Sequence, residues 1–122
     1  MNLTIEGSLN KNHLKAFAEQ PHFDEIYIKD FDIFTVAEAR NFQAIESVNK
    51  IKIWCPVTRA ALRYIVSCPH LKELEVFELR SLGKLTGFEN AKDMTDFCAL
   101  YGLKSPDLLV ISKCPNLRKL GA

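Results

Sequence analysis

The sequence predicts an α/β fold in which short parallel strands alternate with helices as one repeated unit. The first observation behind this prediction is an internal repeat. The seven residues from Cys68 to Leu74 (Cys-Pro-His-Leu-Lys-Glu-Leu) recur from Cys114 to Leu120 (Cys-Pro-Asn-Leu-Arg-Lys-Leu), 46 residues later. The second observation is that segments with strand spacing are separated by segments with helical spacing. This alternation is typical of repeats built from a strand, a turn and a helix.

Strands are expected where apolar residues follow the spacing apolar-x-x-apolar-x-apolar, because alternate residues of a strand face the same side of a sheet. The clearest copies begin at Phe23, Val48 and Leu71, and partial copies lie at residues 3–5 and 117–120. The starts at Phe23, Val48, Leu71 and Leu117 are 25, 23 and 46 residues apart. Since 46 is twice 23, a degenerate unit or a long insertion should occupy residues 80–105, where no strand pattern is visible. We therefore expect four or five strands.

Helices are expected between these strands. Residues 12–19 place apolar side chains at helical spacing. Thr35 and Glu38 form a capping-box pattern, in which each side chain satisfies a backbone N–H at a helix start. Thr58 is the expected cap of the next helix, which carries an apolar face formed by Ala61, Leu62, Ile65 and Val66.

Two further helices are expected towards the end of the chain. One begins near Asp93, runs through Tyr101 and ends at Gly102, because glycine commonly follows the last helical turn. The other begins at the pair Ser105-Pro106, a cap followed by proline at the first helical position. A helix in this place completes the alternation of strand and helix before the second Cys-Pro copy.

The stretch from Trp54 to Val76 resembles the cysteine-containing leucine-rich repeat. In that family a Cys, an Ile/Val-Thr pair, a helix Leu and a Cys-Pro-x-Leu-x-x-Leu-x-Leu run follow one another, and each has a counterpart here. The chain departs from the pattern at Arg59, where the family usually has Asp, in the short segment 51–55, and through residues 80–105. The resemblance implies one domain over residues 1–122: a short leucine-rich-repeat-like solenoid with a parallel sheet on one face and helices on the other. The runner-up is a doubly wound α/β domain.

Composition excludes several classes of protein. The 122 residues are 48% hydrophobic and 25% charged with a net charge of +1, which fits a globular chain and argues against nucleic acid as a partner. No apolar run approaches the ~18–20 residues of a membrane span. The start of the chain lacks the pattern of a secretion signal, and the four cysteines contain no C-x-x-C pair. We expect a cytoplasmic protein with reduced, mostly buried cysteines.

One face of the predicted sheet carries the candidate binding residues. Side chains between the core positions point to the face away from the helices, and this places Trp54 and Phe77 on adjacent strands about 5 Å apart. Exposed aromatic groups of this kind are enriched at binding hot spots. One alternative is that an end repeat or an overhanging helix, such as one in the segment 80–105, covers them, and another is that the strand register is misaligned. The candidate partner-binding residues are Tyr27, Lys29, Lys52, Trp54, Glu75 and Phe77.

No pattern for catalysis is found in the sequence. His22 and His70 occupy equivalent repeat positions, as do Cys68 and Cys114, so the repeat explains these residues better than chemistry does. Gly-rich phosphate loops, H-E-x-x-H and G-x-S-x-G are all absent from the sequence. Four aspartates could form a cation site, but turns and helix caps account for Asp30, Asp32, Asp93 and Asp96. We therefore predict no catalytic residue, no metal and no cofactor.

Taken together, these observations predict a non-enzymatic protein-binding module. Its size suits an immunity or inhibitor protein that neutralises a toxin by covering the toxin's active site. One alternative is an adaptor or substrate-recognition subunit of a larger complex, and a second is a small α/β enzyme. The two terminal strands also predict weak homodimerisation by edge pairing, or that the chain is one piece of a longer repeat array.

Overall fold

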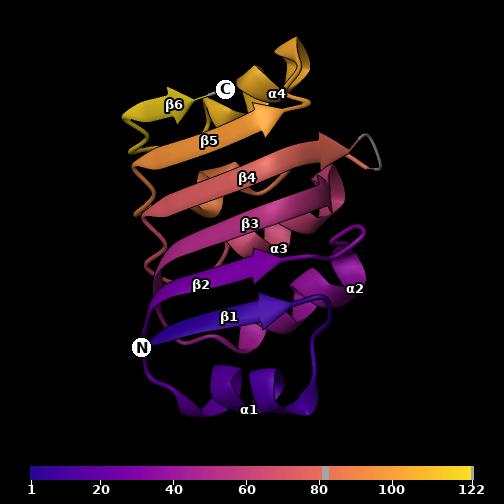
Figure 1. Cartoon of the computed structure of the whole chain (residues 1–122). Coiled ribbons are helices and arrows are strands. Elements are labelled where there is room, and N and C mark those ends of the chain that lie inside the picture. The colour runs from indigo at the N-terminus through magenta and orange to yellow at the C-terminus, as the bar shows by residue number, and fades with distance from the viewer. Residues whose placement is uncertain (81–82, 122) are drawn as a thin grey trace.

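The computed structural model describes residues 1–80 and 83–121. It shows an α/β protein built on a six-stranded sheet whose strands are all parallel and follow one another in chain order (Figure 1). A doubly wound sheet reverses its strand order at a switch point, and this sheet does not. The strands are β1 (Asn2–Glu6), β2 (Phe23–Lys29), β3 (Val48–Thr58), β4 (Glu73–Arg80), β5 (Asp96–Tyr101) and β6 (Lys119–Gly121).

Equivalent residues of neighbouring strands lie side by side. The number of residues between paired positions is 25 from β2 to β3 and 23 at the other junctions, except that it falls to 22 from Pro56 onward in the pairing of β3 with β4. A row of fully buried side chains runs across the sheet on the side of the helices. It consists of Ile5, Ile28, Ile53, Val76 and Ala99. Such a row is expected when buried and exposed residues alternate along each strand and one face of the sheet packs on a core.

The helical segments lie on one side of the sheet, with α2 and α3 behind it and α1 beyond β1 (Figure 1). Aromatic side chains fill the space between. The ring of Phe17 on α1 lies 4.8 Å from that of Phe42. The segments are α1 (Lys11–Glu19), α2 (Val36–Ala39), η1 (Arg40–Ala44), η2 (Arg59–Ala61), α3 (Leu62–Val66), η3 (Phe88–Asn90) and α4 (Ser105–Ile111), where η marks a 3₁₀-helix.

The expected helix from Asp93 to Tyr101 is wrong, because most of that stretch forms β5. Residues 80–105 therefore hold the degenerate repeat unit, and the sheet has six strands instead of four or five. Phe97 and Ala99 are buried and lie beside the core residues Leu74 and Val76 of β4, and Met94, just before β5, is buried as well. Pairing with β4 buries them, whereas the local spacing of apolar residues fits a helix equally well.

The helix starts are confirmed in part. At Thr35 the backbone N–H donates to Glu38 Oε1 at 3.1 Å, so the predicted capping box is present at the start of α2. Thr58 precedes the helical segment as expected, but its buried hydroxyl has no hydrogen-bond partner in the described part of the chain. The cap of α4 is Lys104 in place of Ser105, because Asp107 Oδ2 accepts the Lys104 N–H at 2.8 Å.

The cysteines are free thiols. Cys55, Cys68 and Cys114 are buried, which confirms the expectation for those three, while Cys98 is partly exposed. The Cys114 thiol donates to the carbonyl of Ala91 at 3.4 Å and so satisfies a turn between repeats. Across residues 1–80 and 83–121, no helix has both the length and the apolar character that a membrane span requires.

Candidate functional site

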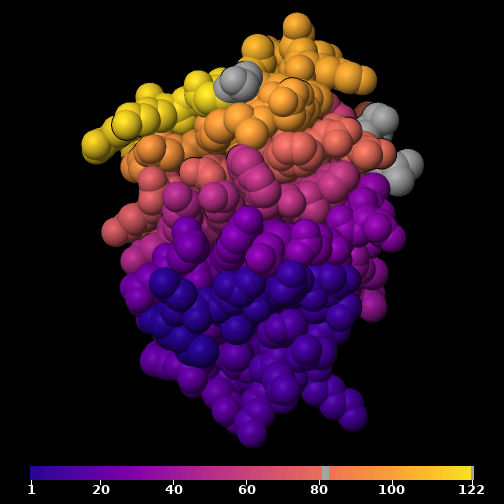
Figure 2. All heavy atoms as spheres, viewed as in Figure 1, coloured from indigo at the N-terminus to yellow at the C-terminus, as the bar shows by residue number. Residues whose placement is uncertain are grey.

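The open face is the sheet surface turned away from the helices, and Figure 2 shows it towards the viewer. It exists because alternate residues of each strand point away from the core. Its registered side chains form rows across the strands. The rows are Asn2, Glu25, Lys50, Glu73, Asp96 and Lys119; then Thr4, Tyr27, Lys52, Glu75, Cys98 and Gly121; then Glu6, Lys29 and Trp54, with Phe77 beside Trp54.

Three aromatic side chains from consecutive strands touch on the open face, and we call them the aromatic row: Trp54, Phe77 and Tyr101. The ring centroids of Trp54 and Phe77 are 5.5 Å apart, and those of Phe77 and Tyr101 are also 5.5 Å apart in an edge-to-face arrangement. Trp54 remains 38% exposed and Tyr101 61% exposed. The rings hold one another in place and still present apolar surface to solvent.

An irregularity in β3 sets the position of Trp54. Ile53 pairs with Val76, whereas Pro56 pairs with Glu78, so β3 contains one more residue than β4 over this interval. Such a bulge bends a strand and redirects its side chains. Here Cys55 turns into the core while the indole of Trp54 lies against the ring of Phe77.

Lysine side chains border the aromatic groups. Lys52 Nζ lies 4.9 Å from the ring centroid of Trp54 and 5.2 Å from that of Tyr27. Lys29 Nζ lies 5.7 Å from the Tyr27 ring, and Lys52 also lies 4.0 Å from a carboxylate oxygen of Glu75. Together with the contact of Trp54 and Phe77, these distances bring all six sequence-predicted site residues into one connected group. Their role in binding remains a prediction.

Two further residues contact this group and were not among the candidate residues. The strand alternation does place Lys50 on this face. Lys50 Nζ lies 3.3 Å from Glu75 Oε1. Although partial burial opposes it, the hydrogen bond and charge of Glu75 raise the pKa of Lys50 above its ordinary value. Tyr101 was missed because its segment was expected to be helical. Its registered partner is Glu78 and not Phe77, so the repeat alone gives no signal for it, and the ring contact with Phe77 is what places it in the row.

One alternative was that the segment 80–105 covers Trp54 and Phe77. Residues 83–101 do not form such a cover. In this segment η3 places Phe88 in the core, where its ring packs against Phe97 with centroids 5.4 Å apart. The segment then extends the sheet beside β4 as β5. It contributes Tyr101 to the aromatic row and leaves Trp54 partly exposed.

A depression of about 220 Å³ lies on the open face where β4, β5 and β6 run side by side. Gly121 contributes no side chain, so the Cys98 thiol forms part of its floor, with the carboxylates of Glu73, Glu75 and Asp96 around it. Burial and the charge of Glu75 both raise the pKa of the Cys98 thiol. The depression offers room for a side chain of a partner, next to the aromatic row.

Ser47, His22 and Asp24 approach the arrangement of a hydrolytic triad. His22 Nδ1 lies 2.8 Å from Ser47 Oγ, and His22 Nε2 lies 3.4 Å from a carboxylate oxygen of Asp24. The same loop position in later repeats holds His70 and Asp93, 3.3 Å apart. Asp24 is 64% exposed, whereas the orienting carboxylate of a triad is buried. The contacts of His22 with Ser47 and of His70 with Asp93 each join equivalent positions of successive loops, and the repeat accounts for them.

The buried thiols are poor nucleophiles. Burial raises the pKa of Cys55 to about 11 and that of Cys68 to about 12, so both stay protonated at neutral pH. Within residues 1–80 and 83–121, no group of three or more His, Cys, Asp or Glu side chains is arranged to hold a metal ion.

Comparison with models of protein families, with curated proteins and with solved structures gave no match to this chain.

Proposed function

We propose that the chain is a non-enzymatic protein-binding module that captures a partner protein on its open face. The observation that carries this proposal is the aromatic row, in which three neighbouring rings stay partly exposed on a sheet surface free of helices. Aromatic residues at the centre of a surface, surrounded by polar ones, are the usual composition of an interface hot spot. The lysines and glutamates around the row supply that polar rim.

Energetic considerations support the aromatic row as the centre of the interface. Burying an exposed large apolar side chain against a partner contributes roughly 1.5–3 kcal/mol. The rings already contact one another, and Lys52 packs against Trp54, so binding orders few additional rotamers. A pre-organised surface retains more of the free energy that burial supplies.

The proposal includes the finer fold class, a short leucine-rich-repeat-like solenoid. It is supported by the strand order, which follows the chain, and by the 23-residue step that holds throughout three of the five junctions and as far as Ile53 in a fourth. Solenoids of this kind present an extended sheet face as their binding surface. The fold proposal and the binding proposal thus point to the same surface.

The narrower form of the proposal is an inhibitor that covers the active site of a toxin. It is supported by a face broad enough to span five strands between Tyr27 and Lys119. If this form is correct, the captured partner is an enzyme whose activity stops when the open face is bound. A captured partner that stays active in the complex would favour the adaptor role.

The test is affinity capture from a native lysate with three baits: wild type, a Trp54→Ala, Phe77→Ala double variant, and Leu14→Ala as a matched control. Leu14 is 40% exposed, close to the exposure of Trp54, but lies on α1 away from the open face. We expect one partner held by wild type and Leu14→Ala and lost by the double variant.

Circular dichroism shows whether each bait is folded. Equal capture by a folded double variant contradicts the proposal, because the rings then contribute nothing to binding. Loss of the fold in the double variant also contradicts it and assigns the rings to stability. The single variant Tyr101→Ala, at the most exposed ring, gives a second reading of the same face.

A further inference from the structure

A depression of about 310 Å³ lies between η2, the segment 83–85 and the start of α4, and we call it the α4 cleft. Leu85, Pro106 and Val110 supply apolar surface to its wall. Gly83 packs so closely on Ala60 of η2 that an added Cβ would not fit, and Leu85 is buried. Small-molecule sites are concave and mostly apolar, with volumes of roughly 300–1,000 Å³, and the α4 cleft lies at the lower end of this range.

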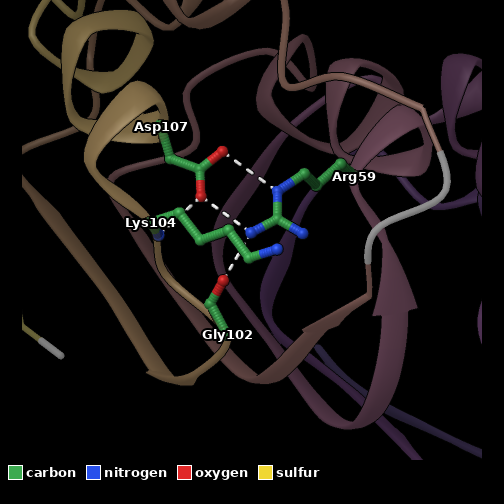
Figure 3. A network of polar contacts seen from close by, with 4 residues as sticks. All are labelled: Arg59, Gly102, Lys104 and Asp107. Atoms are coloured by element: carbon green, nitrogen blue, oxygen red, sulfur yellow. Dashed lines mark hydrogen bonds and ion pairs between the residues drawn. The ribbon is translucent and has the colours of Figure 1, made fainter.

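A buried guanidinium reaches the α4 cleft. Arg59 lines the cleft and is only 6% exposed. Its Nε and Nη2 donate to the carboxylate of Asp107, and Nη2 also donates to the carbonyl of Gly102 (Figure 3). The third nitrogen, Nη1, donates to no acceptor among residues 1–80 and 83–121. Because an unsatisfied guanidinium N–H is costly when buried, Nη1 is a ready donor for the oxygen of a ligand.

Two lysines add positive charge beside Arg59. Lys84 lines the α4 cleft, and the side chain of Lys104 reaches towards the guanidinium in Figure 3. Hydrogen bonds from Arg59 lower the pKa of Asp107 most, and the charge of Lys104 adds to this effect, so Lys104 acts on the same place. Neither lysine forms an ion pair with any residue that the structure describes.

The carboxylates on the helical segments and strand ends around the α4 cleft do not neutralise these lysines. They are Glu38 of α2, Glu78 of β4, Glu89 of η3 and Asp107 of α4. Asp107 is bound to Arg59, and Glu78 lies 2.7 Å from the Nε of Arg80. Glu38 accepts the N–H of Thr35, and Glu89 lines a different depression together with Arg63. The cleft therefore keeps an excess of positive charge, which favours an anion.

We propose that the α4 cleft binds a small organic acid, a carboxylate on a compact apolar body. The carboxylate accepts from Arg59 Nη1 and pairs with Lys84 and Lys104, since charge-assisted hydrogen bonds to a carboxylate are among the strongest available to these groups. The apolar body packs on Leu85 and Val110. A free phosphate fits less well, because it would leave desolvated oxygens against that apolar surface. This activity goes beyond the proposed function, and none of the lining residues belongs to the rows of the open face.

The test titrates the full chain, labelled with ¹⁵N, with benzoate and with benzyl alcohol, which has a similar apolar body and no charge. We expect benzoate to shift the amide signals of Lys84, Leu85 and Val110 until they saturate, and to bind at least about tenfold more tightly than benzyl alcohol. The double variant Lys84→Met, Lys104→Met should weaken benzoate binding by about tenfold or more.

The matched control is Lys92→Met, Lys113→Met, which removes the same charge from two exposed positions that do not line the α4 cleft. It should bind benzoate as wild type does. All four lysines are exposed, so circular dichroism should show both double variants folded. Trp54→Ala, on the open face, should also leave benzoate binding unchanged, so failure here is distinguishable from failure of the proposed function.

Four outcomes overturn the proposal. Benzoate gives no saturable shift of these amides below about 10 mM, or benzyl alcohol binds as tightly as benzoate. The control variant loses as much affinity as the variant of the cleft, which makes the attraction a property of net charge alone. Inorganic phosphate binds more tightly than benzoate, which assigns the cleft to a phosphate group.

Discussion

Arg59 and Asp107 form the most buried ion pair of the described residues, and they join segments 48 positions apart in the chain (Figure 3). Arg59 Nε donates to Asp107 Oδ1 at 3.0 Å, and Nη2 donates to Oδ2 at 2.8 Å. The same Nη2 donates to the carbonyl of Gly102, and the Lys104 N–H donates to Oδ2 at 2.8 Å. The carboxylate thus fixes the start of α4 against η2.

Removal of one partner should be strongly destabilising. We expect Asp107→Asn to lower the free energy of unfolding by about 3–5 kcal/mol, because it leaves the Arg59 guanidinium buried without a counter-charge. Urea denaturation measures this change. The double variant Arg59→Met, Asp107→Leu is the control, and it should recover most of the loss. A loss below about 1 kcal/mol in Asp107→Asn would contradict the buried pair.

The same pair predicts how stability depends on pH. Hydrogen bonds from Arg59 hold the pKa of Asp107 below its ordinary value, despite burial that acts in the opposite direction. As pH falls below about 4, the unfolded chain takes up a proton at this carboxyl before the folded chain does. Stability from this group should therefore be present at neutral pH and be lost under acid. Asp107→Asn should show a shallower acid slope in urea denaturation than wild type, and an unchanged slope would contradict the prediction.

The thiols should differ in reactivity by position. Cys98 is partly exposed while the other three are buried, so iodoacetamide should modify Cys98 first in the folded chain and all four after unfolding. Burial and then the charge of Glu75 raise the Cys98 pKa, which predicts slow modification at neutral pH and faster modification in alkali. Glu75→Gln should increase the neutral rate. Mass spectrometry of the labelled peptides measures the order, and early labelling of Cys68 would contradict it.

At the scale of elements, the turn after β5 depends on a glycine. Gly102 has a φ of +89°, and a Cβ there would overlap the carbonyl oxygen of Leu79 in β4. The positive φ and the close carbonyl oxygen both disfavour a residue with a Cβ, so the turn from β5 to α4 requires glycine at this position.

Substitution of Gly102 should cost more than that of a glycine with open surroundings. Gly7 has a similar φ of +78°, but a Cβ there would meet its nearest atom at 3.8 Å. We expect Gly7→Ala to lose about 1 kcal/mol from backbone strain alone and Gly102→Ala to lose clearly more, with thermal unfolding as the measurement. Equal losses would contradict the close approach of Gly102 to β4.

The elements that the sequence predicts well are those with aliphatic core positions. The strand patterns that begin at Phe23, Val48 and Leu71 became β2, β3 and β4, because alternation alone distinguishes their two faces. The pattern at Met94, Phe97 and Ala99 was not recognised, since Phe97, Leu100 and Tyr101 also fit helical spacing. Pairing with β4 decides the structure there, and no local pattern contains that information.

The candidate site, too, was predictable only where alternation along a strand determines which way a side chain points. Alternation placed Trp54 and Phe77 on one face, and the structure brings their rings together. Tyr101 depends on recognising β5, and the bulge in β3 is a property of strand pairing. The contact of Arg59 with Asp107 lies beyond any local pattern, because it joins residues 48 apart.

At the scale of the whole molecule, the open face carries charges of both signs. Its lysines and glutamates pair with one another, as in the contact of Lys50 with Glu75. We therefore expect binding at the open face to depend mainly on the rings and only weakly on salt. Isothermal calorimetry of the complex at several salt concentrations measures this dependence, and a steep loss of affinity with added salt would contradict it.

Trp54 is the only tryptophan of the chain, so its fluorescence reports on the open face directly. The decisive measurement is quenching of Trp54 emission by acrylamide in the free protein and in the complex with the captured partner, with any partner tryptophans replaced by phenylalanine. The free indole is 38% exposed and should be quenched readily. We predict a blue-shifted emission and strong protection from acrylamide in the complex. An unchanged emission and equal quenching in the complex would contradict binding at the aromatic row.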